Sequence, residues 1–177
     1  MKQALLVIDV QSALVDGDPR PADADGVIGR INGMAARARA AAVPVIYVQH
    51  ERAGTALEYG SPGWQLASGL LTTPEDVRLR KTTPDSFLNT RLEVLLQEQD
   101  IRQLVVCGYA SEFCVDTTVR RAAGLGYAVT LAADAHTSHD KPHASAEQIR
   151  AHENATLPAM TSFGPEIRAV PAEAIQF

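Results

Sequence analysis

Short apolar runs alternate along the chain with longer segments in which apolar residues recur every three or four positions. The short runs are apolar almost throughout, which is typical of strands that are buried on both faces of a parallel sheet. The predicted strands are Ala4–Ile8, Val45–Val48, Val77–Leu79, Leu104–Cys107, Tyr127–Ala132 and Ile167–Val170.

The segments between these runs predict helices. The first is expected to begin near Asp23 or Asp25 and to end near Ala42, and it has a continuous apolar face. That face consists of Val27, Ile31, Met34 and Ala38. Further helices are predicted from Ser86 or Asn89 to Gln99, from Cys114 to Ala123 and from Ser145 to Leu157. This alternation predicts an α/β fold, in which helices cover both faces of a parallel sheet.

The composition fits one globular domain that spans residues 1–177. Of the residues, 46% are hydrophobic and 21% are charged. The 16 basic and 21 acidic residues give a net charge of −5, so we expect no nucleic-acid partner and no membrane partner. The apolar run at the N-terminus is too short for a signal sequence, and the chain has two cysteines, Cys107 and Cys114. A cytoplasmic protein with free thiols is therefore expected.

Polar residues follow the predicted strands at their carboxyl ends, where the working residues of parallel sheets gather. Asp9, His50 and Lys81 each follow one strand, and the segments Gly108–Cys114 and Asp134–His136 follow two others. An aspartate after an apolar strand is either a turn-stabilising residue or a paired or catalytic one. A lysine alone is usually a solvated surface charge. Together with a thiol, however, these residues would supply a nucleophile, a base and a cation.

Cys114 stands at the predicted start of a helix. At that position the positive end of the helix dipole would favour the thiolate, and free N–H groups could stabilise an oxyanion. The alternative is a buried structural cysteine, and the residues leave both interpretations open for Cys114. Cys107 lies inside a predicted strand and fits the structural interpretation.

Two other groups of residues have competing explanations. Three histidines in one loop could hold zinc, although their spacing matches no closed motif and loop histidines also serve as hydrogen-bonding groups. They are His136, His139 and His143. The long segment from His50 to Pro74 carries Trp64, which together with Phe87 could wall a pocket or simply pack.

Three motifs, in the same order along the chain, resemble those of the isochorismatase-like cysteine hydrolases. They are the first strand ending in Asp9, the segment Lys81–Phe87, and the segment Gly108–Thr118 around Cys114. Asp134–Thr137 also resembles the family's segment after the next strand. The resemblance covers nearly the whole chain. It implies a three-layer α/β/α sandwich around a mainly parallel sheet, and a homo-oligomer (a dimer or a tetramer).

The resemblance also implies a catalytic triad of Asp9, Lys81 and Cys114. It further implies a cis peptide bond between Tyr109 and Ala110, and an oxyanion hole formed by the backbone N–H groups of Ala110 and Cys114. The implied reaction is hydrolysis of a C–N bond in a small amide or carbamoyl compound through a thioester. The residues expected to contact this substrate are Gln11, Trp64, Phe87 and Tyr109.

Differences between this sequence and two subfamilies of the isochorismatase-like hydrolases narrow the expected reaction. Nicotinamidase-like members carry an Asp-x-His metal site after the second strand, whereas Tyr47–Arg52 holds a single histidine, so no metal or other cofactor is expected. Members that hydrolyse the vinyl ether of isochorismate generally lack the cysteine, so Cys114 favours C–N hydrolysis. The alternatives are an isochorismatase-type ether hydrolase that relies on Asp9, or a non-catalytic binding protein with the same fold.

Overall fold

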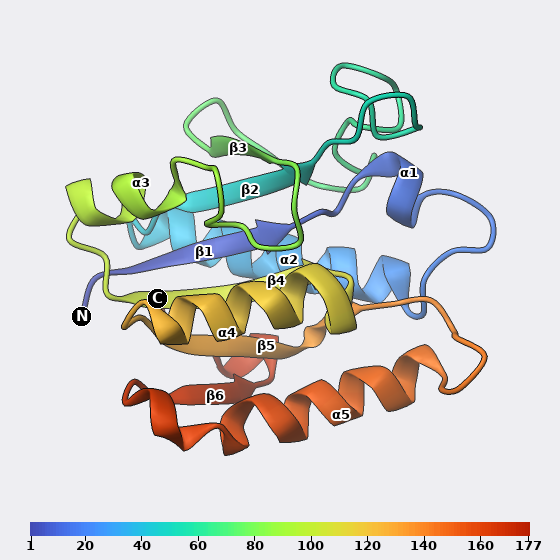
Figure 1. Cartoon of the computed structure of the whole chain (residues 1–177). Helices are drawn as coiled ribbons and strands as arrows, with labels where there is room; N and C mark the ends of the chain where they lie inside the picture. The colour runs from blue at the N-terminus through green and yellow to red at the C-terminus, as the bar shows by residue number, and fades with distance from the viewer.

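A computed structural model describes residues 1–177 as three layers around a central sheet (Figure 1). The sheet has six strands in the order β3-β2-β1-β4-β5-β6, and all neighbouring strands are parallel. The strands are β1 (Gln3–Ile8), β2 (Val45–His50), β3 (Val77–Lys81), β4 (Gln103–Tyr109), β5 (Ala128–Thr137) and β6 (Ile167–Val170). The predicted α/β sandwich is therefore confirmed.

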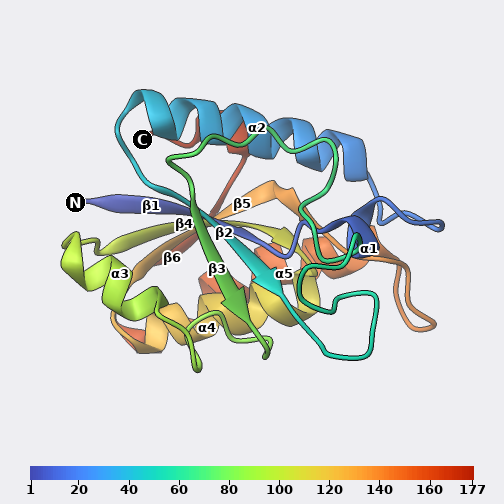
Figure 2. The same cartoon turned by 90° about the horizontal axis from the view of Figure 1, so that it is seen from above.

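Helices cover both faces of the sheet, as the view from above shows (Figure 2). One face is covered by α2 (Ala24–Ala40), and the other by α3 (Leu92–Glu98), α4 (Asp116–Gly124) and α5 (Ala146–Ala159). The shorter helices are α1 (Ser12–Val15), the π-helical turn η1 (Ser111–Val115), η2 (Thr161–Phe163) and η3 (Ala172–Ala174). None of the helices combines the length and the hydropathy needed to cross a bilayer.

Strand β1 illustrates why the strand runs are apolar throughout. Successive side chains of a strand point to opposite faces, and here both faces are covered by helices. Three of its residues lie in the core beneath α3, α4 and α5, and two lie in the core beneath α2. These residues are Ala4, Leu6 and Ile8 on the first face, and Leu5 and Val7 on the second.

The strand order reverses between β1 and β4. From β1 the chain proceeds outward to β2 and β3, then returns to place β4 on the other side of β1. The register sets Ile8 beside Val48 of β2 and beside Gly108 of β4. Ligands of open parallel sheets usually bind outside the carboxyl ends of the strands at such a reversal. The topology thus singles out the residues that follow β1, β2 and β4.

Helix α3 is shorter than predicted, because it begins at Leu92 rather than at Ser86 or Asn89. Asn89 has a φ of 57°, a left-handed conformation that a right-handed helix does not accommodate. The hydroxyl of Thr90 donates to the carbonyl of Ser86 at 2.7 Å and accepts from the N–H of Leu92 at 3.1 Å. Such local side-chain bonds compete with helical ones, so the helix begins only after them.

Strand β5 extends past its predicted end at Ala132. Its pairing with β4 is irregular near Gly108, which lies opposite His136, and β5 accommodates the irregularity with extra residues. Asp134 lies within this irregular part, and its carboxylate pairs with Arg30 of α2 at 3.3 Å. Asp134 therefore lies within the strand, whereas the prediction placed it after the strand's end. The irregularity breaks the apolar pattern from which the strand's end was predicted.

Gly108 is a position where we expect substitution to be especially costly. Its φ is 122°, and a Cβ atom there would clash with the backbone oxygen of Ile8. Gly126 also has a positive φ, 91°, but the space around it is open. Gly126→Ala should cost only the backbone penalty of about 1–2 kcal/mol, whereas Gly108→Ala should lower the midpoint of urea unfolding at least twice as far. Equal losses in the two variants would show that the approach of β4 to β1 does not restrict residue 108.

Candidate active site

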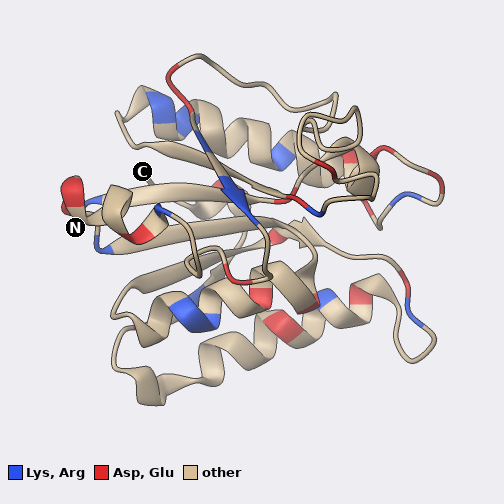
Figure 3. Cartoon of the chain, turned by 45° about the horizontal axis from the view of Figure 1, so that its top comes forward, with Lys and Arg blue, Asp and Glu red and all other residues tan.

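Side chains from three separate elements meet at the carboxyl ends of the strands. Asp9 follows β1, Lys81 ends β3, and Cys114 lies in the turn η1 that follows β4. Basic residues gather along β3, as Figure 3 shows, but only Lys81 among them is buried. Because β2 lies between β1 and β3, and Lys81 is paired with His50 at the carboxyl end of β2, the lysine side chain must cross that end of β2 to meet the carboxylate.

Asp9 leaves the sheet through a sharp turn of the backbone. Its φ is 50°, in the left-handed region that aspartate adopts more readily than most residues do. Its N–H still donates to the carbonyl of Val48 at 2.9 Å, which ties it to β2. The residue is 1% exposed, and a carboxylate this deeply buried is stable only with a close positive partner.

Lys81 is that partner. Its Nζ lies 2.7 Å from Oδ2 of Asp9, and both side chains are buried. The same nitrogen lies 3.0 Å from the carbonyl oxygen of Thr83, 3.2 Å from Sγ of Cys114 and 3.4 Å from Nδ1 of His50. The ammonium group therefore contacts the carboxylate and the thiol at the same time.

The second carboxylate oxygen of Asp9 makes no hydrogen bond. Oδ1 is buried and has no partner in the structure, while Oδ2 is held by Lys81. Burial and the neighbouring ammonium group of Lys81 lower the pKa of His50, whose Nδ1 lies 3.4 Å from Nζ of Lys81. Asp9 thus keeps one oxygen free to accept a proton.

Cys114 carries a protonated thiol in this environment. Burial and the negative charge of Asp9 raise the pKa of Cys114 to about 12, and the opposing effect of Lys81 does not compensate for them. Lys81 favours the thiolate, as predicted for a neighbouring cation, but the net shift of the Cys114 pKa is upward, opposite to the prediction. That prediction considered the cation and the dipole, but it did not include the desolvation of the sulfur or the adjacent carboxylate.

The protonated thiol has a measurable consequence. The rate at which iodoacetamide alkylates Cys114 should keep rising up to about pH 10, because the thiolate fraction grows over this whole range. Alkylation followed by mass spectrometry of the Cys114 peptide measures this rate. Cys107 is fully buried, and burial raises its pKa further still, so it should remain unmodified as an internal control. A rate that levels off near pH 7 would contradict the high pKa of Cys114.

The turn before Cys114 leaves a backbone donor free. The peptide bond between Tyr109 and Ala110 is cis, and the N–H of Ala110 makes no hydrogen bond within the protein. The carbonyl of Ala110 accepts from Phe113 at 3.1 Å and from Val115 at 3.2 Å. In a regular α-helix it would accept from Cys114 instead. The π-helical turn thus separates the Cys114 N–H from this carbonyl, and π-helical turns often occur at functional sites.

Gln11 was expected to contact substrate, but its amide is used within the protein. Both amide protons are donated to backbone carbonyls, to His50 at 3.0 Å and to Trp64 at 2.9 Å. Its oxygen accepts from the N–H of His50 at 2.8 Å, and the side chain is fully buried. Gln11 therefore fastens the segment that carries Trp64 to the ends of β1 and β2. The half-buried indole of Trp64 keeps a buried Nε1 without a partner.

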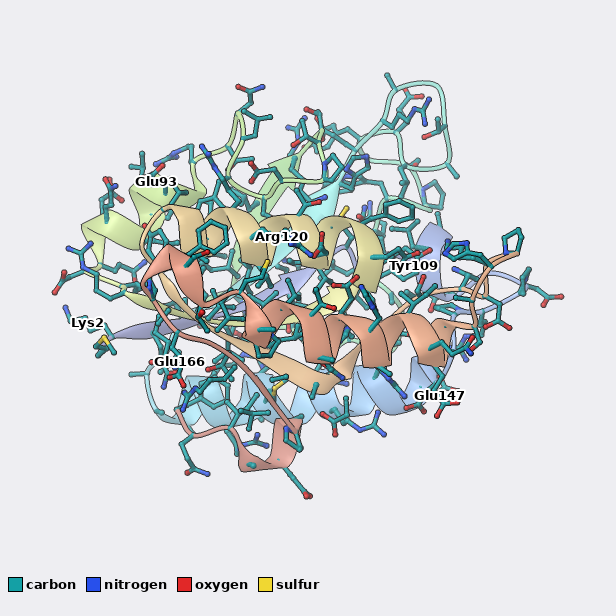
Figure 4. All side chains as sticks on the ribbon, turned by 60° about the horizontal axis from the view of Figure 1, so that its bottom comes forward. Lys2, Glu93, Tyr109, Arg120, Glu147 and Glu166 are labelled. Atoms are coloured by element: carbon teal, nitrogen blue, oxygen red, sulfur yellow. The ribbon has the colours of Figure 1, made fainter.

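Phe87 and Tyr109 are also placed differently from what was expected. Phe87 lies in the core, where its ring packs against Tyr127 with the centroids 5.8 Å apart. Tyr109 is half-buried near the start of α4, and its hydroxyl lies 2.8 Å from Nδ1 of His139 (Figure 4). Phe87 is therefore a core residue, and the hydroxyl of Tyr109 is bound within the protein by His139.

The loop histidines do not converge on a common point that could hold a metal ion. His136 is fully buried, with Nδ1 2.8 Å from Oγ of Ser111 and Nε2 3.0 Å from Oδ1 of Asn154. Both nitrogens of His139 also have protein partners, and His143 is exposed. No group of three potential metal ligands is arranged to hold an ion. His136 and His139 serve as hydrogen-bonding groups, which was the alternative interpretation.

Sequence reasoning did not single out Ser111 or Asn154. Ser111 stands within the segment around Cys114, but no pattern marks one serine of a loop as buried and paired. Asn154 belongs to α5, far along the chain from Ser111, and only the packing of α5 against β5 brings it to His136. One signal could have marked Asn154: a polar residue on the face of a predicted helix that packs against the protein needs a hydrogen-bond partner there.

Known proteins are similar to this chain in sequence and in fold. The model of the isochorismatase domain matches residues 3–162. Streptothricin hydrolase from Streptomyces noursei is 39% identical over 184 residues, which cover 99% of this chain and 64% of that protein. This chain therefore spans less than two thirds of that relative's length.

Two further relatives agree. A ureidoacrylate amidohydrolase from Caulobacter vibrioides is 30% identical over 169 residues, which cover 75% of each chain. A crystal structure of an isochorismatase family protein superposes with a TM-score of 0.84 at 35% identity, covering 95% of this chain and 97% of the other. Since the domain model matches most of the chain and the relatives share its fold, the protein belongs to the isochorismatase family of hydrolases.

Proposed function

We propose that the protein is an amidohydrolase in which Cys114 attacks the carbonyl carbon of a small amide or carbamoyl compound. The observation that carries the proposal is the free oxygen of Asp9 in a site where one lysine contacts both this carboxylate and the sulfur of Cys114. Oδ1 of Asp9 has no partner, while Lys81 holds Oδ2 and contacts the sulfur. A base that is fixed on one oxygen and free on the other can take the thiol proton without moving.

The first half-reaction forms a thioester. As Sγ of Cys114 attacks the carbonyl carbon, its proton passes to Asp9, and Lys81 stabilises the developing negative charge on sulfur. The carbonyl oxygen becomes an oxyanion, which accepts hydrogen bonds from the N–H groups of Ala110 and Cys114. The C–N bond then breaks, and the leaving nitrogen takes the proton back from Asp9. Ammonia or an amine departs, and the acyl group remains on Cys114.

The second half-reaction releases the acid. Asp9 again has a free oxygen, and it removes a proton from a water molecule that attacks the thioester carbon. The same N–H groups hold the second oxyanion. When the C–S bond breaks, the sulfur recovers a proton from Asp9, and the resting thiol is restored.

The relatives support an amide as the bond that is cleaved. One is named for the hydrolysis of streptothricin and another is named an amidohydrolase that acts on ureidoacrylate. These names concern those proteins. They favour a compound with a carbonyl–nitrogen bond as the substrate class for this chain, and the geometry at Cys114 suits attack at such a carbonyl.

The test is a panel of small amides, ureas and carbamoyl acids, each assayed for release of ammonia or amine. For a substrate, rapid acid quenching followed by mass spectrometry should show the acyl group on the Cys114 peptide. Loss of that adduct after hydroxylamine treatment would identify it as a thioester. Two results together would refute the proposal: the unmodified protein releases ammonia without an adduct on Cys114 at any quench time, and a variant that lacks the thiol releases ammonia as well.

A further inference from the structure

The two residues that flank Ala110 are both anchored through histidines. On one side, Oγ of Ser111 lies 2.8 Å from Nδ1 of His136, whose Nε2 lies 3.0 Å from Oδ1 of Asn154. We call Ser111, His136 and Asn154 the inner arm. Ser111 and His136 are fully buried, and the arm connects the turn η1 to β5 and α5. It therefore reaches the site from two separate elements of the fold.

The direction of the protons in the inner arm follows from its far end. The amide nitrogen of Asn154 donates to the carbonyl of Ala133 at 2.8 Å, so its Oδ1 is an acceptor. Nε2 of His136 must then carry the proton that is donated to Oδ1, which leaves Nδ1 as an acceptor. The hydroxyl of Ser111 consequently donates to Nδ1. Burial lowers the pKa of His136 to about 4, so the neutral ring that this pattern needs is present at neutral pH.

The other flank has the same construction nearer the surface. His139 lies with Nε2 3.0 Å from the carbonyl oxygen of Pro19, which can only accept. Its Nδ1 is then the acceptor for the hydroxyl of Tyr109, which lies 2.8 Å away. We call Tyr109 and His139 the outer arm. His139 is partly exposed, whereas Ser111 and His136 of the inner arm are fully buried.

We propose that His136 and His139 are positioning residues for amide hydrolysis, which hold the Ala110 N–H in place by anchoring Ser111 and Tyr109 on either side of it. This inference rests on the proposed function, because it assigns the Ala110 N–H to the oxyanion. Neither histidine touches the reacting atoms. Each acts through the residue that it binds, and the inner arm, being buried, is the stronger of the two.

Positioning of this kind has a specific physical consequence. The Ala110 N–H makes no bond within the protein, so nothing but the conformation of its own segment keeps it directed at the oxyanion. Residues 109 and 111 set that conformation. Loss of one anchor should relax the donor while Sγ of Cys114 keeps its contact with Lys81, which belongs to a different strand. Oxyanion stabilisation should then fall more than the nucleophilicity of the thiol does.

Two reactions of the same thiol separate these quantities. p-Nitrophenyl acetate acylates a cysteine through a tetrahedral oxyanion: the C–S bond forms, p-nitrophenolate leaves, and the thiol proton passes to Asp9. Iodoacetamide alkylates the sulfur by displacement of iodide at a saturated carbon, and no oxyanion forms. The ratio of the two rate constants reports the oxyanion donors, whereas the alkylation rate alone reports the thiol. Both probes act on the whole chain and need no knowledge of the natural substrate.

Ser111→Ala should lower the acylation rate about 10- to 100-fold while the alkylation rate stays within about twofold of the unmodified protein. His136→Asn, whose amide oxygen can still accept from Ser111, should lose less than His136→Ala does. Thr130→Val is the matched control. Thr130 is a buried polar residue of the same strand β5, bonded to Gln103 and Arg168 and distant from the site, and its loss should leave the ratio unchanged.

Parallel losses in both reactions, or no loss of acylation, would overturn the proposal. Should Ser111→Ala not fold, Tyr109→Phe removes only the hydroxyl of the outer arm. A lowered ratio of the acylation rate to the alkylation rate in Tyr109→Phe would support the proposal, and an unchanged ratio would overturn it. Failure of the proposed function would look different. A Cys114→Ala variant that still releases p-nitrophenolate in a stoichiometric burst would show that another group is the nucleophile, whatever the two arms do.

Discussion

Replacing Cys114 with alanine should abolish amide hydrolysis and leave the fold intact. The thiol is the only group that the proposed reaction bonds to the substrate, and its loss should lower kcat by about 10⁴-fold or more. Cys114 is not a fully buried core residue, so the missing sulfur should leave the urea midpoint nearly unchanged. Release of ammonia from a substrate of the unmodified protein measures the effect, and circular dichroism verifies the fold.

Cys107→Ala provides the matched control, because it removes the chain's other thiol. Cys107 is fully buried in β4 and touches only the core, so the variant should keep its activity and lose some stability. Cys114→Ser tests the alternative chemistry. A vinyl-ether hydrolase that relies on Asp9 would retain activity in the serine variant, whereas a cysteine amidohydrolase would not. Full activity of both Cys114 variants on every substrate would remove the cysteine from the mechanism.

The parts of this site that could be predicted are those that the strand pattern determines. Asp9 and Lys81 each come directly after or at the end of an apolar strand, and parallel strands bring their carboxyl ends to one edge. Two such residues from different strands can therefore be paired before any coordinates are known. The reversal of the strand order between β1 and β4 then places both beside the segment that carries Cys114.

The features that could not be predicted depend on three-dimensional packing. The high pKa of Cys114 arises from burial and from the distance to Asp9, and neither is visible in residue types. Gln11 has the polarity of a substrate-binding residue, but its amide is satisfied by the backbone of β2 and of the segment around Trp64. Phe87 has the hydrophobicity of a pocket wall and of a core residue alike, and only packing against Tyr127 separates the two.

Lys81→Met should cause the largest loss of stability of any substitution in the site, together with loss of activity. The carboxylate of Asp9 is buried and its ion-pair partner lies 2.7 Å away, so removing the ammonium leaves an uncompensated buried charge. Breaking such a pair costs about 3–5 kcal/mol of unfolding free energy. Urea unfolding near pH 7 measures the cost.

The double variant Asp9→Asn with Lys81→Met separates stability from catalysis. With both charges gone, the buried site needs no ion pair, and the unfolding free energy should recover to within about 1–2 kcal/mol of the unmodified protein. Activity should not recover at all, because neither the base nor the cation is present. A double variant as unstable as Lys81→Met would show that the lysine's contacts with Thr83 and His50, rather than its pairing with Asp9, maintain the fold. Recovery of stability without activity would mean that this ion pair is retained for the reaction, since an uncharged pair would serve the fold as well.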